Sequence, residues 1–350
     1  EKSRLVFIDG VFSPALSDTT GLPAGVVIGN LAELNHEAIG ATYGSLAGSD
    51  TDAFTALNTA VSQAGAFILI PRGKVVETPI QLLFANLAAG AISNPRVLFI
   101  AEEGSVSCLI ESFAGKSNES ASLTNAVTEI YVAKDANLRH FRIQEEALSG
   151  YHIGSISVNQ EQASHYVNCA ISLGASLCRQ TLNVRISGSN SETVLDGLYL
   201  GTGKQHVDNH TTIDHACRHS SSSQLYKGIL DDSARAVFNG RVFVREGALL
   251  TDAKQLNKNL LLSPNAHVDT KPQLEIFADD VKCAHGATVG QLEDDELFYL
   301  RSRGLGLDKA RALLTYGFAE DVISRITVKS VKKRLDSLVL ERLHQQLEVE

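Results

Sequence analysis

Short runs of alternating apolar and polar residues fill the middle of the chain. From Ala66 to about Ala278 the pattern is one of short runs, within which apolar side chains recur at every second position, the period of a strand with one buried face. Ser, Asn, Asp and Gly fill the gaps between these runs, as they do in turns. The pattern predicts many short strands. The clearest runs are Phe141 and Ile143, then Ile156 and Val158, then Val167, Cys169, Ile171 and Leu173, then Leu182, Val184 and Ile186.

The predicted strands recur at a nearly constant spacing. Six apolar markers are separated by 15, 15, 13, 14 and 13 residues: Ile143, Val158, Leu173, Ile186, Leu200 and Ile213. This regularity favours the stacked coils of a β-solenoid. One local signal disagrees, because Asn239-Gly240 separates two apolar runs in Ala236–Val244, and Asn-Gly is typical of a tight hairpin. A β-sandwich or a barrel is therefore the alternative all-β interpretation.

Both ends of the chain contain segments with the period of a helix. Asp52–Gln63 has apolar residues at helical spacing after an aspartate that can cap the helix. Near the other end, one short helix is expected to stop at Gly304, and the next is expected between Asp308 and Gly317. The last helix either packs on the core of its own chain or docks a partner through one apolar stripe. The stripe consists of Val331, Leu335, Leu338 and Val339.

Composition excludes several kinds of partner. The 350 residues are 44% hydrophobic and 20% charged, which suits a folded chain with a large core. A net charge of -9 gives no electrostatic reason to expect nucleic acid or an anionic membrane as a partner. No apolar run approaches the roughly 18 residues of a membrane span. Five cysteines form an odd and sparse set, which argues against a disulfide framework and indicates a reducing compartment.

One cluster of potential metal ligands lies in a predicted strand. Thiol and imidazole groups are the usual zinc ligands, and five of them fall within fourteen residues: His206, His210, His215, Cys217 and His219. In one continuous strand, His206 and His210 face one side while the other three face the opposite side. They cannot all reach one ion unless a turn intervenes. A polar ladder along the strand is the simpler interpretation, and a zinc-binding protein is the alternative.

A second candidate is the pair Cys283 and His285. It lies where the strand pattern ends and the helical pattern begins. In extended backbone, both side chains project to the same side. Thiolate and imidazole are ligand types that an iron–sulfur cluster accepts. A lone cysteine is more often a buried apolar residue, so the pair alone does not establish a site.

Several long blocks resemble the SufB/SufD family of iron–sulfur cluster assembly scaffold proteins. The resemblance covers roughly residues 125 to 325, and the first hundred residues fit it only loosely. The sequence Cys283-Ala284-His285-Gly286-Ala287-Thr288 resembles the SufD branch, because the SufB branch usually has Cys-Glu-His-Glu-Ala-Thr there. The blocks are HVDNHTTIDH (206–215), QLYKGIL (224–230), AVFNGRVFV (236–244), NKNLLLS (257–263), KPQLEIFADDVKCAHGATVGQL (271–292) and LFYLRSRG (297–304).

The resemblance implies a mainly β fold, with a right-handed parallel β-helix core and α-helical N- and C-terminal parts. We expect a mixed or helical N-terminal region at residues 1–65, which we take to be part of a longer region. The β-helix core is then expected at 66–285 and a C-terminal helical domain at 286–350. The resemblance also implies that Asn239-Gly240 forms a corner of a coil instead of a hairpin.

The resemblance further implies a non-enzymatic scaffold that works with partner subunits. Such a chain pairs with SufB through the β-helix, binds the SufC ATPase through its C-terminal helices and forms a homodimer when alone. A nascent iron–sulfur cluster forms transiently at the subunit interface, with no tightly bound cofactor expected in the isolated chain. Cys283 and His285 match the cysteine and histidine of the family motif, and so become the candidate cluster or iron ligands.

The resemblance also implies a cellular compartment and a source of energy outside this chain. The cytoplasm of a bacterium, or the plastid stroma of a plant or alga, is the expected compartment. The sequence contains no complete phosphate-binding loop of the form Gly-x4-Gly-Lys-Ser/Thr, so the energy has to come from another subunit. The alternative to a scaffold is a β-helix enzyme acting on carbohydrate. An aromatic content of 6% and the lack of tryptophan disfavour it.

Overall fold

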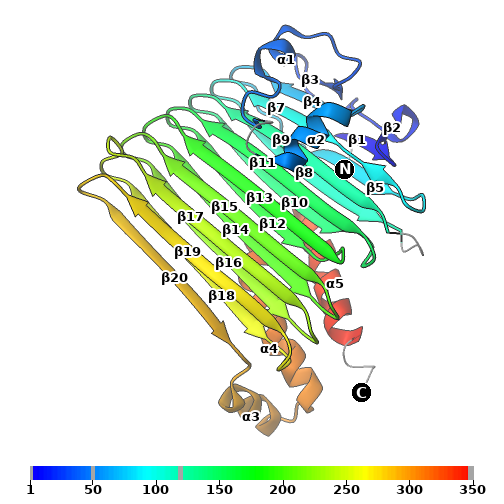
Figure 1. Ribbon diagram of the computed structural model, residues 1–350, viewed down its shortest axis with the longest axis vertical. Helices are drawn as coiled ribbons and strands as arrows, with labels where there is room; N and C mark the ends of the chain where they lie inside the picture. Colours follow the sequence, from blue (N-terminus) through cyan, green and yellow to red (C-terminus); the bar gives the residue numbers. More distant parts are fainter. Residues whose placement is uncertain (1–2, 49–51, 117–120, 346–350) are drawn as a thin grey trace.

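The chain folds into a flattened stack of strands made of two sheets that face each other across a shared core (Figure 1). The computed structural model describes residues 3–48, 52–116 and 121–345. From β7 onward, the longer strands alternate between the two sheets. Neighbouring strands within each sheet are parallel there. The prediction of a mainly β, parallel solenoid is confirmed, and the sandwich and barrel alternatives are wrong.

Each sheet contains strands from almost the whole length of the chain. Sheet A consists of β1 (Ser3–Ile8), β2 (Val11–Phe12), β5 (Ile80–Asn86), β8 (Val106–Gly115), β10 (Asn137–Glu145), β12 (His165–Ser172), β14 (Glu192–Gly201), β16 (Ser221–Leu230), β18 (Asp252–Leu261) and β20 (Lys282–Gly290). Sheet B consists of β3 (Val27–Asn30), β4 (Gly65–Ile70), β6 (Ile92–Ser93), β7 (Arg96–Ala101), β9 (Leu123–Val132), β11 (Tyr151–Gln160), β13 (Leu177–Ile186), β15 (His206–His215), β17 (Arg235–Val244) and β19 (His267–Ile276).

One full turn of the solenoid takes about twice the spacing seen in the sequence. His165 lies beside Glu192, 27 positions later, and Gln224 lies beside Gln255, 31 positions later. The markers Ile143 and Val158 therefore belong to opposite sheets, β10 and β11. The interval of 13 to 15 residues is half a turn, because each turn crosses from one sheet to the other and back.

Many corners between the sheets use a residue in the left-handed backbone region. Asp135, Ala163, His219 and Leu250 have φ values of 58°, 53°, 58° and 59°. The backbone N–H of each donates to a carbonyl oxygen of the next turn, for example Leu250 to Asp280 at 3.0 Å. The corners are thus held to one another along the stack by hydrogen bonds.

The segment around Asn239-Gly240 is neither a hairpin nor a corner. Both residues lie in the middle of β17, so both earlier interpretations are wrong. The glycine has a packing role instead. A Cβ atom at position 240 would lie 2.5 Å from Nε2 of Gln255, which reaches across the interior from sheet A. Glycine inside a strand often marks such a close approach.

The N-terminal elements cover the first turns of the solenoid. They comprise η1 (Pro14–Leu16), α1 (Glu37–Thr42) and α2 (Ala53–Val61), together with β1 to β3. Asp52 caps α2 as predicted, because its carboxylate accepts from the N–H groups of Phe54 and Thr55. Below these elements, a buried ion pair joins Arg96 to Glu129. The expected limits of the three domains stay a prediction.

Three C-terminal helices follow β20: α3 (Asp294–Ser302), α4 (Leu307–Ile323) and α5 (Lys329–Gln345). Helices α4 and α5 lie against the outer face of sheet A (Figure 1). The predicted stripe on the last helix is confirmed, since Leu335 and Val339 are fully buried against this face. Gly317 does not end a helix, because α4 continues through it to Ile323.

Polar contacts also fasten these helices to the sheet. Lys227 is almost fully buried on β16, where its ammonium donates to the carbonyl oxygen of Phe318 at 2.9 Å and pairs with Asp321. Arg325 pairs with buried Asp196 at 2.9 Å. These contacts fix the position of α4 along the solenoid.

Candidate functional site

The solenoid ends in two uncovered strands. Within the described residues, β20 pairs only with β18 and β19 pairs only with β17. Both strands lie at the end of the stack opposite the N-terminal elements (Figure 1). One edge of each strand therefore presents free N–H and C=O groups, a template for pairing with another chain. The apolar side chains of Ile276, Phe277 and Val289 are exposed at the same end.

Cys283 and His285 both lie on β20. Cys283 pairs in register with Ala253, and His285 pairs with Gln255. Ala253 and Gln255 are buried in the interior, so the two candidate residues share the inward face of the last strand. The prediction that both side chains project to one side is confirmed. Because no further turn covers this face, His285 is exposed and Cys283 is only half-buried.

The two candidate ligands have different environments. Cys283 packs against the apolar cluster that ends the core, which includes Val242, Val244 and Ala248. This burial raises the pKa of the Cys283 thiol, an effect that the N–H of Ala253 partly opposes. A metal ion or cluster therefore has to displace a proton from sulfur when it binds.

The pair supplies only part of a coordination shell. No group of three or more His, Cys, Asp or Glu side chains within the described residues is arranged to hold a metal ion. Tetrahedral iron in a cluster and zinc each need four ligands. The geometry of this chain can therefore contribute a sulfur and a nitrogen at an open edge, while other ligands must come from elsewhere.

The five clustered ligands of residues 206–219 do not converge. His210 lies on the outer face of β15, where it pairs with Asp208 at 2.8 Å. His215 points into the interior and hydrogen bonds to the hydroxyls of Ser220 and Ser222 at 2.7 and 2.9 Å. Burial lowers the pKa of His215 to about 4, so the imidazole is neutral at physiological pH. The predicted alternation is confirmed within β15, but the strand ends at His215, so the expected placement of Cys217 and His219 on the same strand face is wrong. The Cys217 thiol donates to the carbonyl oxygen of Ser187 at 2.9 Å, and residues 206–219 form no group that could hold zinc.

A buried polar network was not predicted from the sequence. Arg142 lies inside the solenoid, between Glu111 at 3.4 Å and the Nε2 atom of His152 at 2.7 Å. His152 in turn contacts Glu146 at 2.6 Å, and His140 contacts Glu111 at 3.0 Å. Burial would raise the pKa of Glu111, but the hydrogen bond and charge of His140 and the charge of Arg142 outweigh it and lower that pKa. Every charge has a partner, which indicates a structural role.

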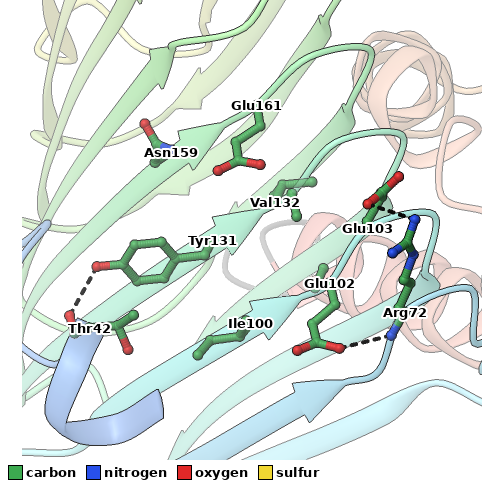
Figure 2. Close-up of a pocket in the computed structure, with 11 residues that line it drawn as sticks. Thr42, Arg72, Ile100, Glu102, Glu103, Tyr131, Val132, Asn159 and Glu161 are labelled. Carbon is green, nitrogen blue, oxygen red and sulfur yellow. Dashed lines mark hydrogen bonds and ion pairs between the residues drawn. The ribbon is translucent and has the colours of Figure 1, made fainter.

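A shallow groove of about 470 Å³ lies on the outer face of sheet B beside α1 (Figure 2). Its floor includes Tyr131, whose hydroxyl donates to the carbonyl oxygen of Thr42 at 2.9 Å. At one side, Arg72 pairs with Glu103 at 3.1 Å and its backbone N–H donates to Glu102 at 2.9 Å. The polar groups of Arg72, Glu102 and Glu103 are thus already paired with one another. The groove also lies near the N-terminal end of the stack, away from the edge that carries Cys283.

These features define a class of protein: a parallel β-solenoid with a thiol and an imidazole at an uncovered end. Residues 84–318 match the SufBD core domain of the SUF system for iron–sulfur cluster assembly, and residues 1–82 match the SufBD N-terminal region. The chain belongs to the SufB/SufD family of iron–sulfur cluster assembly proteins, and within it is SufD-like. The first residues, which resembled the family only loosely, thus also fall within it.

Three relatives illustrate the similarity. An iron–sulfur cluster assembly SufBD family protein of Synechocystis sp. is 37% identical, over 97% of this chain and 77% of its own length. The chloroplastic protein ABCI7 of Arabidopsis thaliana is 36% identical, over 94% and 71%. The iron–sulfur cluster assembly protein SufD of Escherichia coli is 33% identical, over 98% and 79%. Within the described residues, no helix combines the length and apolar character that crossing a membrane requires.

Proposed function

We propose that this chain is the SufD-type subunit of a SufBCD complex, a non-catalytic scaffold on which a nascent iron–sulfur cluster forms at the interface with SufB. The observation that carries the proposal is the position of Cys283 and His285 on the uncovered last strand. A partner that pairs with this edge can bring its own ligands to the same place. In this assembly, the cluster is cargo and not a resident cofactor.

The chemistry of the pair suits transient binding. A scaffold has to hold a cluster and then release it. Mixed nitrogen and sulfur ligation divided between two chains allows release when the chains separate. The half-buried, protonated thiol of Cys283 adds a further requirement, because it binds metal only after losing its proton.

The proposed partners follow from the surfaces of the chain. SufB pairs through the edges of β19 and β20, and a homodimer through the same edges is the form expected when SufB is absent. The SufC ATPase binds the C-terminal helices, whose outer side carries the exposed residues Phe298, Tyr299 and Leu313. ATP hydrolysis in SufC then supplies the energy for changes at the interface. We place the complex in a bacterial cytoplasm or a plastid stroma.

Co-expression with SufB and SufC tests the proposal. Cluster content of the purified complex is measured anaerobically as bound iron and acid-labile sulfide and by visible absorbance. His285→Ala and Cys283→Ala are each expected to lower it strongly while the three subunits still co-purify. His267→Ala is the matched control, because His267 is exposed on β19 but lies on its outer face. Full cluster content in both site variants would contradict the proposal.

A further inference from the structure

A chain of side-chain amides crosses the interior and stops beneath the last strand. Gln224 on β16 donates through Nε2 to the hydroxyl oxygen of Thr211 at 2.8 Å. Gln255 on β18 donates through Nε2 to Oε1 of Gln224 at 2.7 Å. Both hydrogen bonds have the same direction, so each glutamine turns its carbonyl oxygen toward the open end of the solenoid.

The last acceptor of this chain has no partner. Gln255 is 2% exposed, and its Oε1 atom is buried without a hydrogen bond among the described residues. A buried carbonyl oxygen that gives up water without gaining a donor costs roughly 1–3 kcal/mol. Such atoms are rare in folded proteins and call for a specific explanation.

Two neighbouring positions define the space around this amide. Gly240 on the opposite sheet leaves room for it, since a Cβ atom there would lie 2.5 Å from Nε2 of Gln255. The next inward position along the same column of sheet A is His285, which pairs in register with Gln255. Adjacent side chains on one face of a sheet lie about 5 Å apart at Cβ, which is within reach of an imidazole N–H.

We propose that Gln255 is the positioning residue for His285: its Oε1 atom accepts one imidazole N–H and so fixes the tautomer and orientation of the ring. This inference rests on the proposed function, because it concerns the same ligand pair. The second ring nitrogen then keeps its lone pair and is available to iron or a cluster. Metal-binding histidines usually have such an acceptor behind them, and losing it typically costs 10–100-fold in metal affinity or activity.

The direct test is the tautomer of His285 in the purified chain. Nitrogen-15 NMR of histidine-labelled protein distinguishes the two neutral tautomers, and the spectrum of His285→Gln assigns the signal. Wild type is expected to show one dominant tautomer. Gln255→Met keeps the volume but removes the acceptor, so a mixture of both tautomers is expected. Gln255→Asn withdraws the amide by one methylene group and gives the same readout if the Met variant does not fold.

A matched control separates positioning from general disturbance of the end of the solenoid. Thr270→Val removes another buried oxygen without a partner, the hydroxyl of Thr270 on the inward face of β19. It is expected to leave the tautomer of His285 unchanged. Mixed tautomers in the wild type, or one unchanged tautomer in both Gln255 variants, would overturn the inference.

The co-expressed complex distinguishes this inference from the proposed function. Competition with an iron chelator measures how tightly the complex retains iron. Gln255→Met is expected to weaken retention about tenfold or more, and Thr270→Val is expected to leave it unchanged. A wild-type complex without iron defeats the proposed function, although the NMR result stands. Unchanged retention in Gln255→Met, in a complex that loses its cluster in His285→Ala, defeats only the role of Gln255.

Discussion

The contact between Asp196 and Arg325 couples the packing of the C-terminal helices to pH. Asp196 lies on the outer face of β14 and is 3% exposed, whereas Arg325, just after α4, remains 45% exposed. Burial raises the pKa of Asp196 to about 6, and the charge and hydrogen bond of Arg325 hold it from rising further. Replacing Arg325 by glutamine removes that support while keeping a long polar side chain.

The expected loss depends on the protonation state of Asp196. Removing one partner of a fully buried ion pair costs about 3–5 kcal/mol. Because Arg325 is half exposed and screened by water, we discount this to about 2 kcal/mol at neutral pH. The pKa of Asp196 is raised on folding, so folding favours the protonated form; the contribution of Asp196 to stability falls as pH rises from 3.8 through about 6 and then stays constant. A protonated Asp196 no longer needs the arginine, and the cost of Arg325→Gln should shrink to well below 1 kcal/mol at about pH 5.

Urea unfolding followed by circular dichroism measures this difference, since the chain has no tryptophan to report by fluorescence. Wild type and Arg325→Gln are compared at about pH 7.5 and about pH 5. Lys329→Gln is the control, because it removes the same charge from an exposed residue that forms no ion pair in the described structure. A loss for Arg325→Gln that is equal at both pH values, or that grows in acid, would refute the reasoning.

Three further changes test other parts of the fold. Burial lowers the pKa of His215 to about 4, so wild type loses stability as pH falls from 6.5 toward 4. His215→Gln should lose less over this range, by up to about 3 kcal/mol. Acid unfolding curves measure the difference, and identical curves would contradict it. Gly240→Ala should destabilise the chain by about 1–3 kcal/mol in urea, since its Cβ would lie 2.5 Å from Gln255 Nε2; a neutral change would mean that the Gln255 side chain moves freely. Leu335→Ala should cost about 2–5 kcal/mol, because Leu335 is fully buried against sheet A, and faster proteolysis within α5 would report the loosened helix.

The sequence predicted the strands and the solenoid that they form, because alternation of apolar residues directly reflects burial of one face of a strand. It did not show that the interval of 13 to 15 residues is half a turn, since strands of both sheets have buried residues at every second position and give the same signal. The repeat is weak for a related reason. Successive corners share a left-handed backbone, but Ala163 and Leu250 adopt it without being glycine. The corners therefore share a backbone conformation and not a residue type, so the sequence repeat is hard to detect.

The candidate pair was predictable only with the family in mind. Cys-Ala-His in extended backbone indicates a shared side, and this much was confirmed. The sequence does not show that this side faces the interior at the end of the solenoid, next to Gln255. That position depends on which strand is the last one in the sheet. Periodicity cannot reveal this, because β18 and β20 have similar lengths and differ only in having or lacking a neighbour. The buried network around Arg142 was missed because its members come from three different strands, β8, β10 and β11, and from the turn after β10.

The stacking of turns also sets where the molecule opens first. Backbone hydrogen bonds join each turn only to the turns before and after it, so stability propagates mainly between nearest neighbours, as in a one-dimensional chain. The turn formed by β19 and β20 has a neighbour on one side only, and fraying should begin there and decay toward the centre. Among the strands of this end, amide exchange would then be fast at β20, which carries Cys283 and His285. A subunit that binds this end would act as the missing neighbour, and ordering of Cys283 and His285 would be coupled to assembly itself.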